Sequence, residues 1–319
     1  MNVYWFQDSK TGHLKQVQAL LDQLKKETEL SITPINFFNQ ESLPAMLSNK
    51  NELDGPTILI GAGHDVYSKI LQGKKYIEKL TDQNIFSIAV LRPSYKLNSF
   101  DLIVAPEHDF RKGNLPKNVI SFRGSLAATS QAPIDENKAI IAIGGPSKHY
   151  KFDQKILMKQ LHYILSMHPK HKFKIFNSRR TPDALNEEFK NELKNYPNAK
   201  FIHLNSPESD SFQETLNKSA LKFVTPDSSN LVFEALSTQG QTYLIQIENS
   251  RYRRIFGTKK IRESMHELVN SKQVGVVSVL NKKGGIDISK IEPPSKHFEP
   301  LAEVERVSFS IMKFINHQK

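Results

Sequence analysis

The sequence predicts an α/β fold with two domains, each built on a parallel sheet. Two observations lead to this prediction. Short apolar runs alternate with amphipathic helical segments along most of the chain, and this alternation breaks only once. Parallel strands are covered by helices on both faces, so they read as continuous apolar runs rather than alternating ones. Alternating strands and helices indicate parallel sheets with right-handed crossovers.

The strand-like runs fall on both sides of the break. In the first half they lie at residues 3–6, 57–63, 85–91, 101–106 and 118–122. In the second half they lie at residues 139–145, 173–178, 199–204, 221–226, 242–247 and 274–280. Helical stripes separate several of these runs, for example Leu14, Val17, Leu21 and Leu24. The segments "TPDALNEEFKNELKN" and "SSNLVFEALSTQ" begin with helix-starting residues and continue with helical periodicity.

The break lies between Arg123 and Lys138, where "GSLAATSQAPIDEN" shows neither the apolar run of a strand nor the periodicity of a helix. We interpret it as a linker that separates an N-terminal domain, residues 1–130, from a C-terminal domain, residues 138–319. The chain ends in a helix with an apolar stripe over residues 301–315. That stripe raises the option that this helix packs back on the N-terminal domain.

Composition narrows the class of protein. The 319 residues are 38% hydrophobic and 24% charged, and no apolar run reaches the ~20 residues of a membrane span. The absence of cysteine excludes disulfides, thiolate metal sites and cysteine nucleophiles. The N-terminus resembles no signal peptide, so we expect a cytoplasmic location or a peripheral one at the cytosolic face of a membrane.

We interpret the net charge of +11 first as a contribution to solubility. Binding of an anionic substrate or membrane surface is the second interpretation, and binding of nucleic acid is a distant third. No basic run is interleaved with the aromatic residues that single-strand binders use, so we expect no specific nucleic acid.

The loops that follow the strands carry the polar chemistry. In open parallel sheets, ligands bind beyond the carboxyl ends of the strands. The loops found there are "DSKTGHLKQ", "GAGHD", "GGPSKHY", "SRRTP" and "TPDSSN". In the first, Gly12 permits close approach of a ligand to a helix start, and His13 can contact it. The plain alternative is ordinary turn chemistry.

The second half holds the residues that suit a phosphate. Paired glycines followed by serine and lysine in "GGPSKHY" favour an anion, and the adjacent arginines of "SRRTP" match phosphate or carboxylate. A surface ion pair is an equally good interpretation of those arginines. Asp227 or Ser228 caps a helix on which Glu234 lies about two turns further on, among apolar neighbours. One ligand could therefore extend from the helix start to Glu234.

Six motifs occur in the order and spacing of one family: "DSKTGHLKQ", "FDLIVAPEHD", "NVISFRGSL", "IAIGGPSKHY", "NSRRTP" and "TPDSSNLVFEAL". The chain thus resembles the ELONGATED MITOCHONDRIA family, mitochondrial fission proteins of plants that are also widespread in bacteria. That family is similar to glycosyltransferases of the GT-B architecture. The resemblance implies two Rossmann-like domains facing across a cleft, with a nucleotide-sugar bound by the C-terminal domain.

The resemblance also implies roles for matched residues. Gly12 and Glu107 fall on the acceptor side, and His13, His108 and Asp109 are the catalytic candidates. The implied nucleotide-sugar ligands are Gly144, Gly145, Ser147, Lys148, Ser178, Arg179, Arg180, Thr181, Asp227, Ser228, Ser229 and Glu234. The chain departs from the family pattern at "DSKTGHLKQ", which lacks one glycine, and at "EALSTQGQT", which lacks a proline.

The resulting hypothesis is a glycosyltransferase that needs no metal and no cofactor and uses a nucleotide-sugar as donor. His13 is the first candidate for the base, because imidazole titrates near neutrality. A lipid-linked acceptor at an anionic membrane surface is the expected partner. Two alternatives stay open: a nucleotide-sugar epimerase on the same fold, and a binding or scaffold protein without catalysis.

Overall fold

The computed structural model describes residues 1–36, 55–110, 113–147, 150–249, 259–281, 287–295 and 299–318. The chain forms two compact units. The first contains Met1–Thr129 together with Ala302–Lys319, and the second contains Ser130–Leu301. The division between Thr129 and Ser130 lies within the segment that breaks the sequence alternation.

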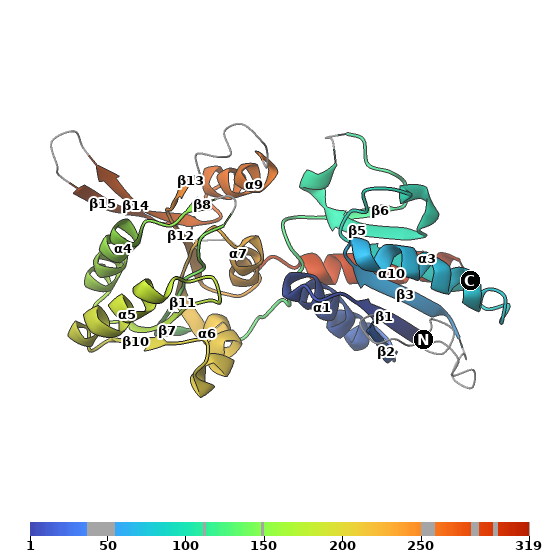
Figure 1. The fold of residues 1–319 in the computed structure, drawn as a ribbon, viewed down its shortest axis with the longest axis horizontal. Coiled ribbons are helices and arrows are strands. Elements are labelled where there is room, and N and C mark those ends of the chain that lie inside the picture. Colours follow the sequence, from blue (N-terminus) through green and yellow to red (C-terminus); the bar gives the residue numbers. More distant parts are fainter. Residues whose placement is uncertain are drawn as a thin grey trace. The chain divides into compact units, whose positions relative to one another are not determined.

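The first unit holds a six-stranded sheet in which every pairing is parallel (Figure 1). Its order is β2-β1-β3-β4-β5-β6. The strands are β1 (Asn2–Gln7), β2 (Ser31–Asn36), β3 (Thr57–Ala62), β4 (Ile85–Val90), β5 (Leu102–Pro106) and β6 (Val119–Phe122). All residues of β3 and β4 are buried, as expected for strands covered on both faces.

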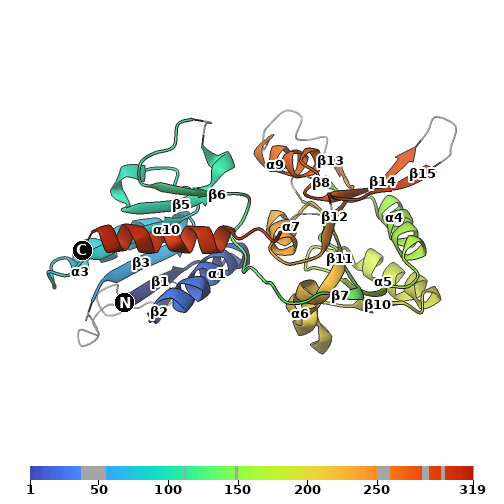
Figure 2. The same cartoon turned by 180° about the vertical axis from the view of Figure 1, so that it is seen from behind.

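Helices cover both faces of this sheet. The chain's last helix, α10 (Glu303–His317), packs beside α1 (Thr11–Glu27) on one face, as Figure 2 shows. Helix α3 (His64–Ile77) covers the other face. The apolar stripe of α10 enters the same core as that of α1, through Val304, Val307, Ile311 and Ile315. The terminal helix therefore belongs to the core of the first unit.

The second unit holds a seven-stranded sheet in the order β10-β9-β7-β11-β12-β14-β15. The strands are β7 (Asp135–Ala142), β9 (Lys172–Phe176), β10 (Ala199–Ile202), β11 (Ser219–Val224), β12 (Gln241–Ile245), β14 (Gly275–Asn281) and β15 (Asp287–Glu292). Only β15 runs antiparallel to its neighbour. A separate antiparallel pair joins β8 (Tyr150–Lys151) to β13 (Glu248–Asn249).

Helices α4 (Gln154–Met167) and α5 (Asp183–Glu192) cover one face of the second sheet. The other face is covered by α6 (Phe212–Lys218), α7 (Ser229–Leu236) and α9 (Lys259–Asn270). Both sheets are thus α/β layers of the doubly wound kind, which confirms the predicted fold class. In chain order the second sheet reads 3-2-1-4-5-6 before its antiparallel edge, the order of the Rossmann fold.

The strand order defines one crevice in each unit. Ligands bind where neighbouring strands send their crossovers to opposite faces of the sheet. In the first unit that switch point lies between β1 and β3, which are followed by α1 and α3. In the second it lies between β7 and β11, which are followed by α4 and α7. Four of the five loops singled out in the sequence begin at these two places, and the fifth, after β9, meets the loops of the second.

Candidate functional site

At the switch point of the second unit, the paired glycines meet the loop that follows β11. The Gly144 N–H donates to Thr225 Oγ1 at 2.8 Å, and the Gly145 N–H donates to Asp227 Oδ2 at 3.1 Å. A Cβ on Gly144 would lie 2.2 Å from Asp227 Oδ2, and a Cβ on Gly145 would lie 1.9 Å from the backbone oxygen of Arg180. The glycines are therefore required because three loops close on one another here.

Arg180 is held to this loop junction by a buried carboxylate. Its Nη2 donates to Asp227 Oδ2 at 2.6 Å. The Asp227 side chain is fully buried, whereas the Arg180 side chain is 43% exposed. One end of the guanidinium is thus fixed in a defined geometry while part of the group faces solvent. An anchored, exposed arginine is well suited to bind phosphate.

Ser178 and Thr181 close the loop that carries the arginines. Thr181 Oγ1 donates to the Gly144 carbonyl at 2.5 Å and accepts from the Ser178 N–H at 2.9 Å. Arg179 is exposed on the same loop. Ser147 Oγ accepts from the Tyr150 N–H at 3.2 Å. Lys148 lies outside the described residues.

The buried carboxylate of Asp227 braces this loop junction. It accepts from the Gly145 N–H and from Arg180, which are the N–H and charged partners that a buried carboxylate needs. The loop after β7 leads into β8, and α4 begins only after Asp153, whose carboxylate accepts from the Ile156 N–H. Tyr150, which the sequence interpretation missed, is buried here; burial first, and then the charge of Asp227, raises its pKa to about 12.

Helix α7 begins at the same junction. Ser228 is its N-cap and accepts from the Leu231 N–H at 3.4 Å, and Ser229 is its first residue. Glu234 lies further along the helix and is half-buried, as its apolar neighbours predicted. The C-terminal end of α7 rests on Lys222, whose Nζ donates to the carbonyls of Ala235 and Thr238 at 2.7 and 2.9 Å. The departure "EALSTQGQT" therefore forms an ordered end to the helix.

In the first unit, the loop after β1 places a carboxylate against His13. Asp8 Oδ2 lies 2.6 Å from His13 Nδ1, and Asp8 Oδ1 accepts from the Lys10 N–H at 3.0 Å. The Asp8 side chain is 1% exposed and that of His13 is 22% exposed. Since an ionised carboxylate only accepts hydrogen bonds, Nδ1 carries the proton and Nε2 is the nitrogen that can accept one. Asp8 stands in a quoted motif, yet sequence reasoning assigned it no role.

Gly63, after β3, packs directly on this pair. Its φ of +106° and the 2.5 Å that would separate a Cβ from Asp8 Oδ2 both require glycine. The loops after β1 and β3 are thus in contact at the switch point. Gly12 is the second residue of α1 and therefore lies in the first turn of the helix that carries His13.

The "PEHD" residues follow β5 at the same edge of the sheet. Glu107, His108 and Asp109 form a single 3-10 turn; Glu107 is exposed and the other two are half-buried. The pKa of Tyr67 is raised, and burial is the main cause; the negative charges of Asp8 and Asp109 raise it further. The tyrosine therefore lies within electrostatic reach of both carboxylates, at the switch point.

Two Rossmann-like units, each with polar loops gathered at the switch point of its sheet, define a GT-B-like α/β protein. The sequence matches the mitochondrial fission ELM1 family over residues 11–314, and the chain belongs to that family.

Two relatives and a solved structure are similar to the chain. The chain is 24% identical to the mitochondrial fission protein ELM1 of Arabidopsis thaliana over 247 residues, which are 66% of this chain and 56% of that protein. It is 25% identical to an uncharacterized protein of Rickettsia prowazekii, with 98% of both chains covered. The chain spans little more than half the length of the plant relative.

A UDP-GlcNAc 2-epimerase from Neisseria meningitidis, solved with UDP-GlcNAc bound, has a similar fold. The TM-score is 0.54 and the identity is 11%, with 99% of this chain and 100% of that chain covered. Among the described residues, no helix combines the length and the apolar character needed to cross a membrane.

Proposed function

We propose that the protein is a glycosyltransferase that binds a nucleotide-sugar in its second unit and uses His13 of its first unit as the general base. The observation that carries the proposal is the Asp8–His13 pair at the switch point of the first sheet. A buried carboxylate that fixes the tautomer of a partly exposed histidine is the arrangement by which a base is oriented. His108 and Asp109 are the next candidates for that role.

In this proposal the second unit binds the diphosphate. Arg180 takes the charge that develops on the leaving phosphate, since Asp227 holds it in place before the reaction. Arg179 and the first turn of α7 add positive potential. Glu234 binds sugar hydroxyls of the donor. The acceptor hydroxyl loses its proton to His13 Nε2 as it attacks the anomeric carbon, and the nucleotide leaves with the electrons of the broken bond. We place this acceptor on a lipid at an anionic membrane surface, a proposal supported by the net charge of +11.

A nucleotide-sugar epimerase is the second candidate, because the Neisseria protein of similar fold is a UDP-GlcNAc 2-epimerase. An epimerase exchanges a sugar proton with solvent, whereas a transferase releases nucleotide. Incubating the protein with a panel of nucleotide-sugars in D₂O therefore separates the two reactions. Deuterium in recovered nucleotide-sugar supports the epimerase, and nucleotide release without exchange supports the transferase. Binding with neither result removes the epimerase and leaves the scaffold protein or a transferase that needs its acceptor for nucleotide release.

Variants test the assigned roles. Asp8→Asn and His13→Ala should each lower turnover by roughly 10²–10⁴ and leave nucleotide affinity nearly unchanged. Arg180→Ala should weaken binding of a nucleoside diphosphate by ~1.5–3 kcal/mol, measured by calorimetry. Lys190→Ala, which removes an exposed cation from α5, is the matched control and should change neither quantity. Wild-type turnover in His13→Ala would remove the histidine from the mechanism.

A further inference from the structure

One face of the second sheet carries lysines on three adjacent strands. Lys138 of β7 pairs in register with Lys172 of β9, and Lys174 of β9 pairs with Lys200 of β10. Side chains alternate between the two faces along a strand, so these four lysines share one face. Lys218 of α6 stands beside them. We call these five residues the lysine groove.

The groove exists because α6 is short. Toward the carboxyl ends of the strands the same face is apolar, and Phe176 and Ile202 pack there with Leu216 of α6. A helix of seven residues is about 10 Å long, whereas the eight residues of β7 extend over about 26 Å. The helix therefore cannot cover the whole length of the strands. The lysines occupy this face toward the amino-terminal ends.

Exposure alone does not account for the choice of lysine. Like charges directly opposite each other in a sheet are destabilising, and uncharged polar residues would be solvated as well. Carboxylates pair with three of the lysines: Glu208 with Lys200 at 2.6 Å, Glu214 with Lys218 at 2.7 Å and Asp135 with Lys138 at 3.1 Å. In the described part of the chain, the central Lys172 has no ion-pair partner. The groove thus retains excess positive charge at its centre.

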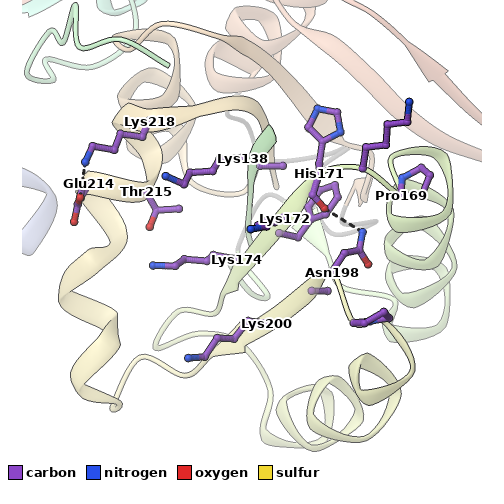
Figure 3. Close-up of a pocket in the computed structure, with 15 residues that line it drawn as sticks. Lys138, Pro169, His171, Lys172, Lys174, Asn198, Lys200, Glu214, Thr215 and Lys218 are labelled. Carbon is purple, nitrogen blue, oxygen red and sulfur yellow. Dashed lines mark hydrogen bonds and ion pairs between the residues drawn. The ribbon is translucent and has the colours of Figure 1, made fainter. Parts of the chain in front are cut away.

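The lysines surround a hollow of about 610 Å³, shown in Figure 3. In that view the side chains of Lys138, Lys172, Lys174 and Lys200 extend toward the same open space beside α6. Pro169 and Pro197 contribute apolar walls. A volume of this size is typical of small-molecule sites, and a concave shape fits a compact ligand better than a flat bilayer.

We propose that the lysine groove binds a small, multiply phosphorylated anion at a site separate from the Arg180 loop. Lys138 and Lys172 lie in the first half of their strands, whereas the Gly144 loop follows the carboxyl end of β7. The two sites therefore lie toward opposite ends of the same sheet. A compact polyanion contacts lysines on three strands about 4.8 Å apart and relieves their mutual repulsion.

Calorimetric titration with inorganic triphosphate tests the proposal. We expect saturable binding that weakens steeply with salt, because the contacts are ionic. The double variant Lys172→Gln/Lys174→Gln should bind at least tenfold more weakly while keeping the wild-type circular dichroism. The control Lys25→Gln/Lys26→Gln removes two exposed cations from α1 and should bind as the wild type does. Arg180→Ala, which removes the proposed diphosphate site, should still show the triphosphate site that the groove variant loses, and this separates the two sites.

Three results would overturn the proposal. The first is no saturable binding by the wild type at low salt. The second is an equal loss in the α1 control, which would make the binding a property of net charge. The third comes from vesicles of anionic phospholipid: if the groove variant abolishes vesicle binding and triphosphate does not compete, the groove is a membrane-docking surface instead.

Discussion

Replacing Lys222 with methionine tests how the end of α7 is held. This lysine lies on β11 and is fully buried. Its Nζ donates to the Ala235 carbonyl and to both oxygens of Thr238, at distances between 2.5 and 2.9 Å. Burial lowers its pKa from 10.5 to about 7. The three oxygens match the three donors of an ammonium. These hydrogen bonds favour the charged form of Lys222, whereas desolvation favours the neutral form.

The magnitude follows from the two pKa values. Above pH 10.5 the side chain is neutral in both states, and below about pH 7 it is charged in both. Between these limits the unfolded chain binds a proton that the folded chain does not, so the free energy of unfolding rises with pH. At ~1.4 kcal/mol per tenfold change in proton affinity, the penalty is about 4–5 kcal/mol at pH 7 and about 1–2 kcal/mol at pH 9.5.

Urea unfolding of the wild type and of Lys222→Met at both pH values measures this effect. The variant loses the titrating group, so the wild type should gain about 3 kcal/mol relative to it between pH 7 and pH 9.5. Lys26→Met, which removes an exposed lysine, should show no such gain. A difference that stays constant with pH would refute the reasoning, because it would mean that the three acceptors keep Lys222 charged in the folded protein.

Two further substitutions test the second unit. Gly145→Ala should destabilise the protein by ~1–3 kcal/mol in thermal or urea unfolding and weaken nucleotide binding, because the new Cβ would lie 1.9 Å from the backbone oxygen of Arg180; wild-type values for both would show that the loops can separate freely. Lys174→Gln should raise the melting temperature at low salt and lose that gain at high salt, since it removes the repulsion with Lys200. An equal gain at both salt concentrations would point to packing rather than charge.

Local patterns in the sequence were enough to predict the layers of the fold. Continuous apolar runs predicted β3 and β4, which are wholly buried, and the interruption after Arg123 contains the point where the two units divide. The loops at the two switch points could be anticipated in the same way, because parallel strands bring their carboxyl ends to one edge. The half-buried state of Glu234 also followed from its neighbours. These features depend on periodicity and on residues close in the chain.

Tertiary structure decided which polar groups meet. Asp8 and His13 are five residues apart, and the loop after β3 packs on the pair so closely that only glycine fits at position 63. Arg180 and Asp227 are 47 residues apart, and only the folded chain brings the arginine onto the buried carboxylate. In the sequence, nothing distinguishes Lys222 from other strand lysines; its burial against the C-terminal end of α7 is a result of packing.

The lysine groove shows the same limit of sequence reasoning. Its residues are scattered over β7, β9, β10 and α6, and only the strand order and the shortness of α6 bring them to one exposed face. The sequence by itself determined the buried strands, several helices and the loops that carry charge, but it missed the edge strands β2 and β15. Strand order and the partner of each buried charge arise from packing between distant segments, which periodicity along a single chain does not encode. The apolar stripe of α10 indicated that this helix is buried, and the structure decided that it packs in the first unit.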